Sequence, residues 1–251
     1  MSRSSRPITW ISSEDPPEAF PILDYALSEP EGLLAAGGDL SPPRLLYAYR
    51  NAIFPWYNEG QPVLWWSPDP RCVLRPGAFH LARRLRRSLK SSGFFISFNA
   101  QFDEVIEACS GARHGQSGTW ITREMKSAYR SLHRQGWAHS VEVRKQGALV
   151  GGLYGLSIGR AFFGESMFSR ENNASKAAML ALSAELLERQ FMILDCQVVS
   201  PHLLSLGATH MPREAFASLL DRACSPEAPL KLGNDACRPI IDYLPAPAHM
   251  A

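Results

Sequence analysis

The sequence lacks the marks of a metal-binding, disulfide-rich or membrane protein. Its 251 residues include five cysteines, an odd number, and no two of them have C-x-x-C spacing. Neither a disulfide framework nor a zinc site is therefore expected. No run approaches the roughly 18 apolar residues that span a bilayer, and Met1 to Trp10 lacks the apolar core of a secretory signal. We expect a cytoplasmic protein with reduced thiols, no metal and no membrane contact.

Acidic residues are missing from one stretch of an otherwise balanced chain. The formal net charge is only +2, from 26 basic and 24 acidic side chains. Between Arg75 and Lys90 there is no acid but a dense set of basic residues. Most charged helix faces are simply solvated, yet a confined basic face on a near-neutral protein is typical of contact with a polyanion. The candidate phosphate-binding residues are Arg83, Arg84, Arg86, Arg87 and Lys90.

Residues 1–71 leave little room for long helices or strands, because proline, glycine and tryptophan are frequent there. One helix is expected to begin at Pro42, with Asp39 or Ser41 as its N-cap. From residue 72 onwards the periodicity of apolar residues is clearer. We therefore predict a small, loop-rich N-terminal domain, residues 1–71, and a larger second domain, residues 72–251.

The second domain is predicted to be α+β, with a mixed β-sheet flanked by helices. Apolar residues at helical spacing indicate helices over 79–89, 102–109, 123–135 and 174–189, and Pro212 is expected to open a last helix. Alternating or continuous apolar runs indicate strands over 94–98, 139–143, 149–157, 161–168 and 192–198. The segment Lys145-Gln146-Gly147 is expected to close a hairpin between two of these strands.

Two groups of motifs are more specific than these patterns. The first is EPEGLLAAGGDL at 29–40, followed by FPWY at 54–57 and WWSPDPR at 65–71. The second is GESMFS at 164–169, NASK at 173–176, DCQ at 195–197 and HLLSLGA at 202–208. In order and spacing, from about Phe20 to about Phe216, they resemble the bacterial leucyl/phenylalanyl-tRNA–protein transferases. The resemblance implies an enzyme that moves an amino acid from a charged tRNA onto the N-terminus of a protein.

The resemblance also implies substrates. The donors would be leucyl-, phenylalanyl- or methionyl-tRNA, and the acceptors would be proteins that begin with Arg or Lys, which the transfer marks for degradation by the N-end rule. Separately, the expected order of helices and strands resembles the fold of the acyl-CoA N-acyltransferases (GNAT), which cradle the CoA pyrophosphate on a glycine-rich loop. Here the corresponding segment, Ser166 to Lys176, contains no glycine. An aminoacyl-tRNA ester is the expected donor, and no cofactor is expected because the ester supplies the driving force.

Asp195 and Gln197 are the first candidates for catalysis. They are two residues apart on an expected strand and would share a face, where they could simply satisfy backbone groups at the strand end. Aminoacyl transfer, however, needs a neutral α-amine, and the pKa of such an amine is roughly 7.7–8.0. The Gln197 carbonyl could accept a hydrogen bond from this amine, while Asp195 polarises Gln197 or stabilises the developing ammonium. The resemblance implicates both positions in catalysis.

Glu165 is a third catalytic candidate, because it is an acid in an otherwise apolar run and such acids are seldom left unpaired. One interpretation is a structural ion pair with Arg170 or Lys176. The other is that Glu165 binds a polar group of the substrate. The resemblance implies that this group is the terminal adenosine of the tRNA or the aminoacyl amine.

Selection of Leu, Phe or Met requires an apolar pocket, and binding of a tRNA end favours aromatic stacking platforms. Apolar residues at strand and helix spacing are usually core, and only the resemblance singles some of them out. A Leu stands at 153 where the family is expected to have Met, with little change in volume. Trp56 and Trp120 are the candidate platforms, although either could be buried. The pocket candidates are Leu153, Phe162, Met167, Met179 and Leu194.

Two other classes of function remain open at this point. A cysteine hydrolase or acyltransferase could use Cys196 with His202 and Asp195, and replacement of Cys196 by Ala would then abolish its activity. A non-catalytic tRNA-binding module could use the arginine face and the tryptophans. Such a module would bind charged and uncharged tRNA equally and would tolerate the loss of Asp195 and Gln197.

Overall fold

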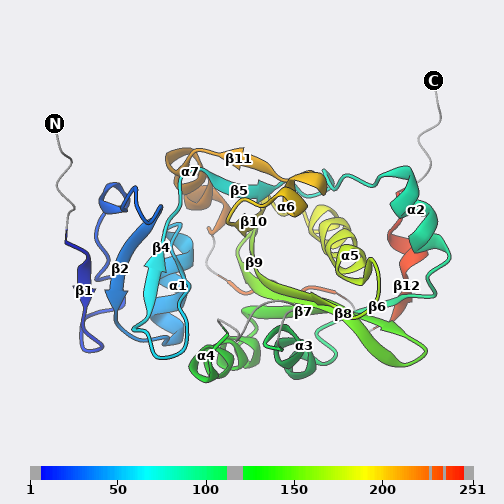
Figure 1. Ribbon diagram of the computed structural model, residues 1–251, viewed down its shortest axis with the longest axis horizontal. Coiled ribbons are helices and arrows are strands. Elements are labelled where there is room, and N and C mark those ends of the chain that lie inside the picture. Colours follow the sequence, from blue (N-terminus) through cyan, green and yellow to red (C-terminus); the bar gives the residue numbers. More distant parts are fainter. Residues whose placement is uncertain (1–6, 112–120, 226–227, 234–235, 246–251) are drawn as a thin grey trace.

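The computed structural model describes residues 7–111, 121–225, 228–233 and 236–245. Trp120, one of the two candidate stacking platforms, lies outside these ranges. The described residues form two β-sheets with helices around them (Figure 1). The first sheet uses strands between Thr9 and Trp66, and the second begins with the strand that starts at Arg71.

The first sheet has four short strands in the order β1-β2-β4-β3. Helix α1, Pro42–Arg50, begins where the prolines predicted it, with Ser41 as its N-cap. Asp39 does not cap the helix directly, because its carboxylate accepts the Ser41 backbone N–H at 2.6 Å and pairs with Arg44. The strands are β1 Thr9–Ile11, β2 Leu33–Gly37, β3 Phe54–Pro55 and β4 Leu64–Trp66, and a short 3-10 helix, η1, covers Leu23–Tyr25.

The second sheet has eight strands in the order β11-β5-β10-β9-β8-β7-β6-β12. Neighbouring strands are antiparallel except for β9 and β10, which are parallel and are joined by helix α5, Ala174–Glu188. The expected hairpin is β7 with β8. The strands are β5 Arg71–Leu74, β6 Phe95–Phe98, β7 Ala138–Lys145, β8 Ala148–Ile158, β9 Ala161–Ser169, β10 Ile193–Gln197, β11 Thr209–Met211 and β12 Arg238–Pro239.

Helices cover both faces of the second sheet. Helices α3, Phe102–Cys109, and α4, Arg123–Arg134, pack on one face, and α5 packs on the other (Figure 1). Since α5 is enclosed, its buried residues lie on every side of the helix. Helix α1 contacts α4 and α7 and so joins the two sheets. The other helices are α2 Arg83–Lys90, α6 Pro201–Ser205, α7 Arg213–Ala223 and the 3-10 helix η2 Ile240–Tyr243.

The predicted α+β architecture, with a mixed sheet flanked by helices, is confirmed, and most elements lie where the sequence placed them. Helix α2 is an exception, since it begins at Arg83 rather than Phe79. The preceding segment is held outside the helix because the His80 N–H donates to the Leu206 carbonyl. Pro212 precedes α7 as its N-cap instead of occupying the first turn. The described part of the chain contains no helix long and apolar enough to cross a membrane.

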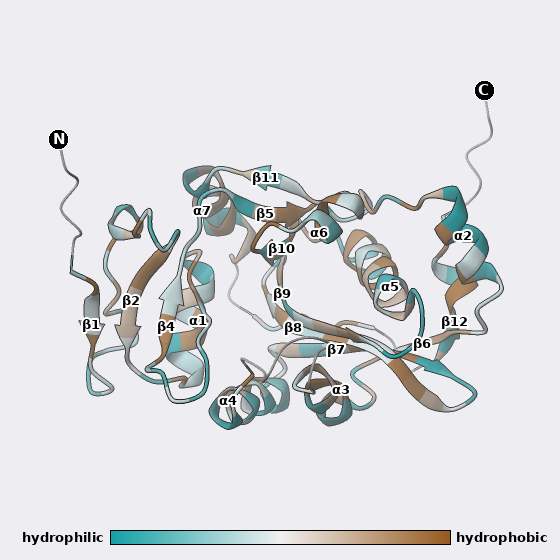
Figure 2. Ribbon diagram, in the orientation of Figure 1, coloured by the Kyte–Doolittle hydropathy of each residue, from teal (hydrophilic) through white to brown (hydrophobic). Residues whose placement is uncertain are grey.

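Hydrophobicity follows this arrangement. Strand β2 and much of β5 are hydrophobic in Figure 2, whereas α2 is largely hydrophilic. In α2 only Leu85 and Leu89 are buried. This helix therefore rests on the protein by one narrow apolar edge and presents the rest of its surface to solvent.

Candidate active site

A cavity opens where two central strands part. β9 and β10 pair from Ala161 and Ile193 only as far as Phe163 and Asp195. Beyond this point β9 continues beside β8, whereas β10 remains paired with β5. The diverging strands, together with β8, α3, α5 and the segment around β3, line a cavity of about 1230 Å³. Ligand sites in proteins are commonly cavities of about 300–1,000 Å³ with mostly apolar walls and a few polar groups, so this cavity is somewhat larger than most.

Each of the two diverging strands carries an extra residue at the cavity. Glu165 in β9 has no partner in β8, and Cys196 in β10 has none in β5. Both residues line the cavity, as expected of bulges, which redirect side chains and are frequent beside active sites. Gly155 lies opposite the first bulge, where a Cβ would approach the Phe163 carbonyl oxygen to 2.2 Å. A glycine is therefore required there for the strands to pack this closely.

Glu165 is the central polar group of the cavity, although only 7% of it is exposed. Its Oε1 accepts hydrogen bonds from the Tyr49 hydroxyl and the Gln197 side-chain amide, both at 2.7 Å. Its Oε2 accepts from the Tyr129 hydroxyl at 2.7 Å, and the two tyrosine oxygens are 2.5 Å apart. Burial raises the pKa of Glu165 from 4.5 to about 7, in spite of these hydrogen bonds. The carboxyl therefore titrates near neutral pH.

Asp195 is fully buried and bound to Arg71. The guanidinium Nε and Nη2 donate to its two carboxylate oxygens at 2.9 and 2.7 Å. Arg71 lies 4.6 and 4.9 Å from the ring centroids of Phe54 and Phe216. Asp195 also accepts the backbone N–H of Gln197 at 2.8 Å. This last bond holds Gln197 in the left-handed backbone region, at a φ of 62°, which non-glycine residues seldom adopt.

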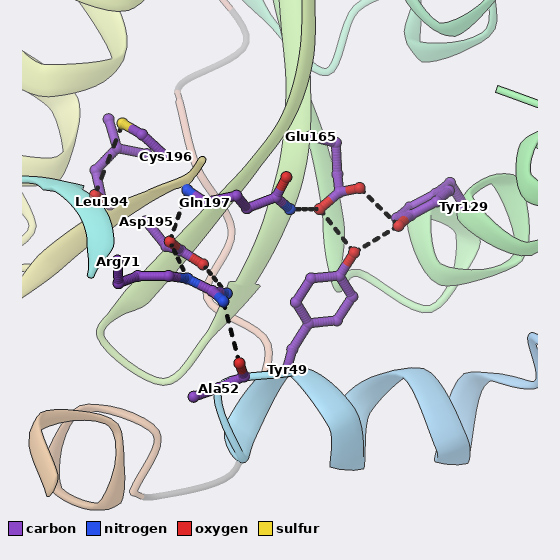
Figure 3. Close-up of polar contacts among 9 residues, drawn as sticks. All are labelled: Tyr49, Ala52, Arg71, Tyr129, Glu165, Leu194, Asp195, Cys196 and Gln197. Carbon is purple, nitrogen blue, oxygen red and sulfur yellow. Dashed lines mark hydrogen bonds and ion pairs between the residues drawn. The ribbon is translucent and has the colours of Figure 1, made fainter. Parts of the chain in front are cut away.

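These contacts form one chain of polar interactions (Figure 3). It runs from the Ala52 carbonyl, which accepts from Arg71 at 3.1 Å, through Asp195 and Gln197 to Glu165. At the other end of the chain of contacts, Glu165 accepts a hydrogen bond from Tyr49, which lies three residues before Ala52. The side-chain nitrogen of Gln197 faces Glu165, so its carbonyl oxygen points away from that carboxyl and can accept a hydrogen bond. The arrangement supplies an acceptor, a carboxyl that titrates near 7 and an adjoining apolar space.

Comparison with known proteins identifies the family of this chain. A model of the leucyl/phenylalanyl-tRNA protein transferase family matches residues 73–221, and a model of its N-terminal domain matches residues 38–69. The chain belongs to the leucyl/phenylalanyl-tRNA–protein transferase family. The enzyme of that name from Pseudomonas entomophila is 53% identical over 215 residues, which are 86% of this chain and 94% of the relative. The one from Hahella chejuensis is 54% identical over 80% of this chain and 86% of its own.

Solved structures resemble the chain more distantly. The C-terminal domain of a putative lysylphosphatidylglycerol synthetase from Agrobacterium fabrum is 11% identical, with a TM-score of 0.43, over 75% of this chain and 73% of its own. A GCN5-related N-acetyltransferase from Kribbella flavida is 11% identical, with a TM-score of 0.35, over 68% of this chain and 61% of its own.

Most of the residues predicted to form the aminoacyl pocket lie on the apolar wall of the cavity. Leu153, Met167, Met179 and Leu194 line the cavity as predicted. Phe162 instead is fully buried behind this wall, in the core under α5. It lies on the same face of the sheet as its neighbour Leu194, but its ring packs over Gly155 in the core and does not reach the cavity. The wall also includes residues that the sequence analysis did not single out, among them Leu149, Phe168, Leu182 and Leu203.

The structure places one of the two candidate platforms of this transferase at the cavity. Trp56 lines the cavity and is 42% exposed, so the alternative that it is buried is wrong. Its ring lies 5.7 Å from that of Trp66, whose indole N–H donates to the Trp56 carbonyl. The hydrogen bond holds the backbone of Trp56, and its side chain remains partly open to the cavity.

The basic helix of the transferase adjoins the cavity without lining it. Asn173, which precedes α5, donates to the Ser88 hydroxyl of α2 at 3.0 Å, and Ser175 in the first turn of α5 lines the cavity. Arg83, Arg84, Arg87 and Lys90 are exposed. Arg86 is partly buried and donates to the Pro245 carbonyl, so it differs from the other four by anchoring the C-terminal segment.

Several interactions differ from those that the sequence suggested for this transferase. Among the described residues, the partners of Glu165 are tyrosines and Gln197, not Arg170 or Lys176. Arg170 donates to the Leu149 carbonyl instead. Tyr49, Tyr129 and Arg71 were missed, because each is far from its partner in sequence and isolated tyrosines in helices are usually core. Arg71 did carry one signal, since it ends the specific motif WWSPDPR.

The cysteine-based alternative does not match the geometry of this transferase. Both Asp195 oxygens accept from Arg71, so Asp195 is not available to orient a histidine. The Cys196 thiol is hydrogen-bonded to the neighbouring thiol of Cys72. This contact and burial raise the pKa of Cys196 well above its usual value. A thiol with a raised pKa is a poor nucleophile at neutral pH.

Proposed function

We propose that this protein transfers leucine, phenylalanine or methionine from an aminoacyl-tRNA to the N-terminal amine of proteins that begin with Arg or Lys, and so marks them for degradation. The observation that carries the proposal is the cavity, in which an apolar wall directly adjoins Glu165 and Gln197. The names of the relatives support leucine and phenylalanine as donors. The ester of the donor supplies the driving force, so no cofactor is part of the proposal.

The donor is proposed to bind with its amino-acid side chain against Leu153, Met167, Met179 and Leu194. Met side chains adapt to differently shaped ligands, which suits a pocket for Leu, Phe and Met. The terminal adenine would stack on Trp56, an interaction worth about 1–3 kcal/mol. The phosphates of the acceptor stem would meet the exposed basic residues of α2. Recognition of the tRNA then rests on charge and shape, and selection rests mainly on the amino acid.

The acceptor amine is proposed to approach the Gln197 carbonyl oxygen. Asp195 supports this contact indirectly, because it holds the Gln197 backbone N–H and is itself fixed by Arg71. Orientation of a nucleophile within about 3–3.5 Å of a carbonyl carbon removes much of the entropic barrier to its attack. Gln197 is therefore proposed to touch substrate, whereas Asp195 and Arg71 are positioning residues.

The test is transfer of labelled leucine from leucyl-tRNA to a peptide that begins with Arg, with wild type and Gln197→Ala. Wild type is expected to transfer leucine, and Gln197→Ala is expected to be slower by roughly 10²-fold, the loss typical of a misplaced reactant. A matched peptide that begins with Glu measures acceptor selection. No transfer by wild type with intact tRNA binding would refute the proposal in favour of a non-catalytic tRNA-binding module.

Cys196→Ala separates the transferase from a cysteine enzyme. The proposed mechanism uses no thiol, so this variant is expected to retain transfer within a few-fold of wild type. Abolished transfer, with the protein still folded and binding leucyl-tRNA, would favour covalent catalysis by Cys196.

A further inference from the structure

Tyr49, Tyr129 and Glu165 form a closed triangle of hydrogen-bonding contacts. The hydroxyl oxygens of the tyrosines are 2.5 Å apart, and each lies 2.7 Å from a different oxygen of the carboxyl group. The three groups come from α1, α4 and β9, so the triangle is assembled only in the folded protein. Both tyrosines are fully buried, and Glu165 alone of the three lines the cavity.

The triangle requires one proton more than the tyrosines provide. Three contacts at these distances need three protons, and two hydroxyl groups supply two. If Glu165 is ionised and each tyrosine donates to it, two hydroxyl oxygens face each other at 2.5 Å with no proton between them, which is repulsive. If Glu165 is protonated, its O–H donates to one tyrosine and all three contacts are satisfied. The Gln197 amide brings its own proton and does not change this count.

We propose that the Tyr49–Tyr129–Glu165 triangle is the proton acceptor of the transfer reaction. The proposal rests on the proposed function and deepens it, by assigning the atom that takes the proton from the acceptor amine. The ionised triangle lacks one proton and is thereby poised to take it. Gln197 orients the amine through its carbonyl oxygen and contacts Glu165 through its amide nitrogen, so one side-chain amide separates the amine from the carboxyl, a gap that one water can bridge.

The transfer uses two protons of the acceptor nitrogen, and each has its own acceptor. The N-terminal ammonium of the acceptor gives one proton to the Glu165 carboxylate, directly or through one water. The neutral amine then attacks the ester carbonyl carbon, and a C–N bond forms. The C–O bond to the terminal ribose breaks, and the ribose oxygen takes the second proton of the attacking nitrogen. Glu165 finally releases its proton to solvent, and the products are the amide and the free tRNA end.

The charged and titratable groups around Glu165 agree with this role. Tyr49 from α1 and Tyr129 from α4 face it directly, and burial together with the Glu165 charge raises the pKa of both phenols well above the usual value. Asp195 from β10 adds a like charge that is largely matched by Arg71 from β5. Tyr154 from β8 stacks edge-on against Tyr129. Burial is the main cause that brings the pKa of Glu165 to about 7.

A direct test follows the carboxyl itself. In protein labelled with ¹³C at the glutamate side-chain carboxyl, the Glu165 resonance is identified by its loss in Glu165→Gln. It is expected to titrate with a midpoint near 7, well above that of exposed glutamates. A Glu165 that stays ionised down to pH 5 would overturn the proposal. This measurement needs no substrate, so its result does not depend on whether the proposed function is correct.

A kinetic test asks whether the proton is used. Single-turnover transfer from saturating leucyl-tRNA to an Arg-peptide is measured from pH 6 to pH 9. At pH 7 Glu165→Gln is expected to lose at least about 10²-fold in rate, as is typical for loss of a general base. It should regain about tenfold towards pH 9, because an amine with a pKa of roughly 7.7–8.0 is only about one-tenth neutral at pH 7 and almost fully neutral at pH 9. Affinity for tRNA should be unchanged.

Two results would overturn the kinetic assignment. An equal loss at every pH would make Glu165 a positioning residue, and no loss would remove it from the chemistry. Glu188→Gln, an exposed glutamate at the end of α5, is the matched control and should behave as wild type. Wild type that transfers no leucine at any pH would instead refute the proposed function.

Discussion

Glu165 shows how a single residue can favour function at the expense of stability. Its carboxyl is 7% exposed and lies among two phenols, an amide and a second carboxylate. An ionised carboxylate is costly to bury when no cation touches it. The resulting rise in pKa suits the proton transfer proposed for Glu165 near pH 7, but the folded protein must then hold a charge that the unfolded chain would solvate better.

The stability of the protein should therefore respond to the protonation of Glu165. Because the pKa is raised from 4.5 to about 7 in the fold, the native state binds more protons than the unfolded state between these values. This contribution to the free energy of unfolding is full at low pH and falls as pH rises from about 4.5 to 7. Above pH 7 the free energy of unfolding is therefore expected to be lower than at low pH by about 3 kcal/mol from this group alone.

Glu165→Gln mimics the protonated carboxyl, since its amide can accept at one atom and donate at the other. We expect the variant to be more stable than wild type at pH 8, by up to about 3 kcal/mol, and nearly equal at pH 5. Urea denaturation at both pH values measures the difference. A stability difference that is the same at pH 5 and pH 8 would contradict this explanation, and Glu188→Gln should show no difference.

Glu165 and Gln197 could be recognised from sequence because each is a polar residue in an apolar strand, where a partner is obligatory. Tyr49 and Tyr129 could not, since they lie 116 and 36 residues from Glu165. No spacing along the chain reports such a contact, and a tyrosine at helical period looks like core. Asp195 was recognised, but its partner Arg71 lies 124 residues away. Because Arg71 occupies both carboxylate oxygens, we propose that Asp195 positions Gln197 and does not contact the substrate.

At the scale of elements, the site depends on the point where β9 and β10 part. The sequence predicted both strands and α5 between them, because each has a clear apolar pattern. It did not predict β5, which is a four-residue strand beginning directly after the proline-rich segment. Without β5 neither the bulge at Cys196 nor the burial of Asp195 could be foreseen. Pairings between distant strands set these features, whereas local periodicity sets the helices.

The Arg71–Asp195 ion pair joins β5 to β10 and, through Ala52, to the end of α1. Arg71→Met would leave Asp195 charged, buried and without its partner. Removal of one member of a buried pair typically costs about 3–5 kcal/mol, and we expect a loss of stability of this size in urea denaturation. Wild-type stability in Arg71→Met would show that the pair contributes little to the fold.

The double variant Arg71→Met with Asp195→Leu separates stability from positioning. It removes both charges, so most of the lost stability should return. The Gln197 backbone N–H, however, loses its acceptor, and the left-handed conformation of Gln197 loses its support. Transfer should therefore remain slow, with kcat reduced and tRNA affinity retained. Full recovery of both stability and kcat would show that Asp195 has no positioning role.

Across the whole molecule, charge is arranged unevenly around the cavity. Helix α2, which carries exposed basic residues, contacts the N-cap of α5 through Ser88, whereas Asp103, Glu104 and Glu107 of α3 line another part of the cavity wall. These acids are paired with Arg130, Arg144 and Lys126. An incoming polyanion is thus attracted to the α2 side. We therefore expect the tRNA to meet the α2 side of the cavity, although the net charge of the chain is only +2.

The salt dependence of tRNA binding should report the contacts of α2. Each basic residue that meets a phosphate contributes about 0.7–0.9 to the slope of log K against log salt concentration. Arg84→Ala with Arg87→Ala is expected to lower that slope by the sum of two such contributions. Binding should weaken for every tRNA alike, because phosphate contacts position a nucleic acid without reading its sequence.

Arg222→Ala on α7 is the control, since it removes an exposed arginine from a helix outside this face. An unchanged slope in the double variant would place the acceptor stem elsewhere on the molecule. A reduced slope with unaltered preference among Leu, Phe and Met would show that α2 holds the tRNA while the apolar cavity wall selects the amino acid.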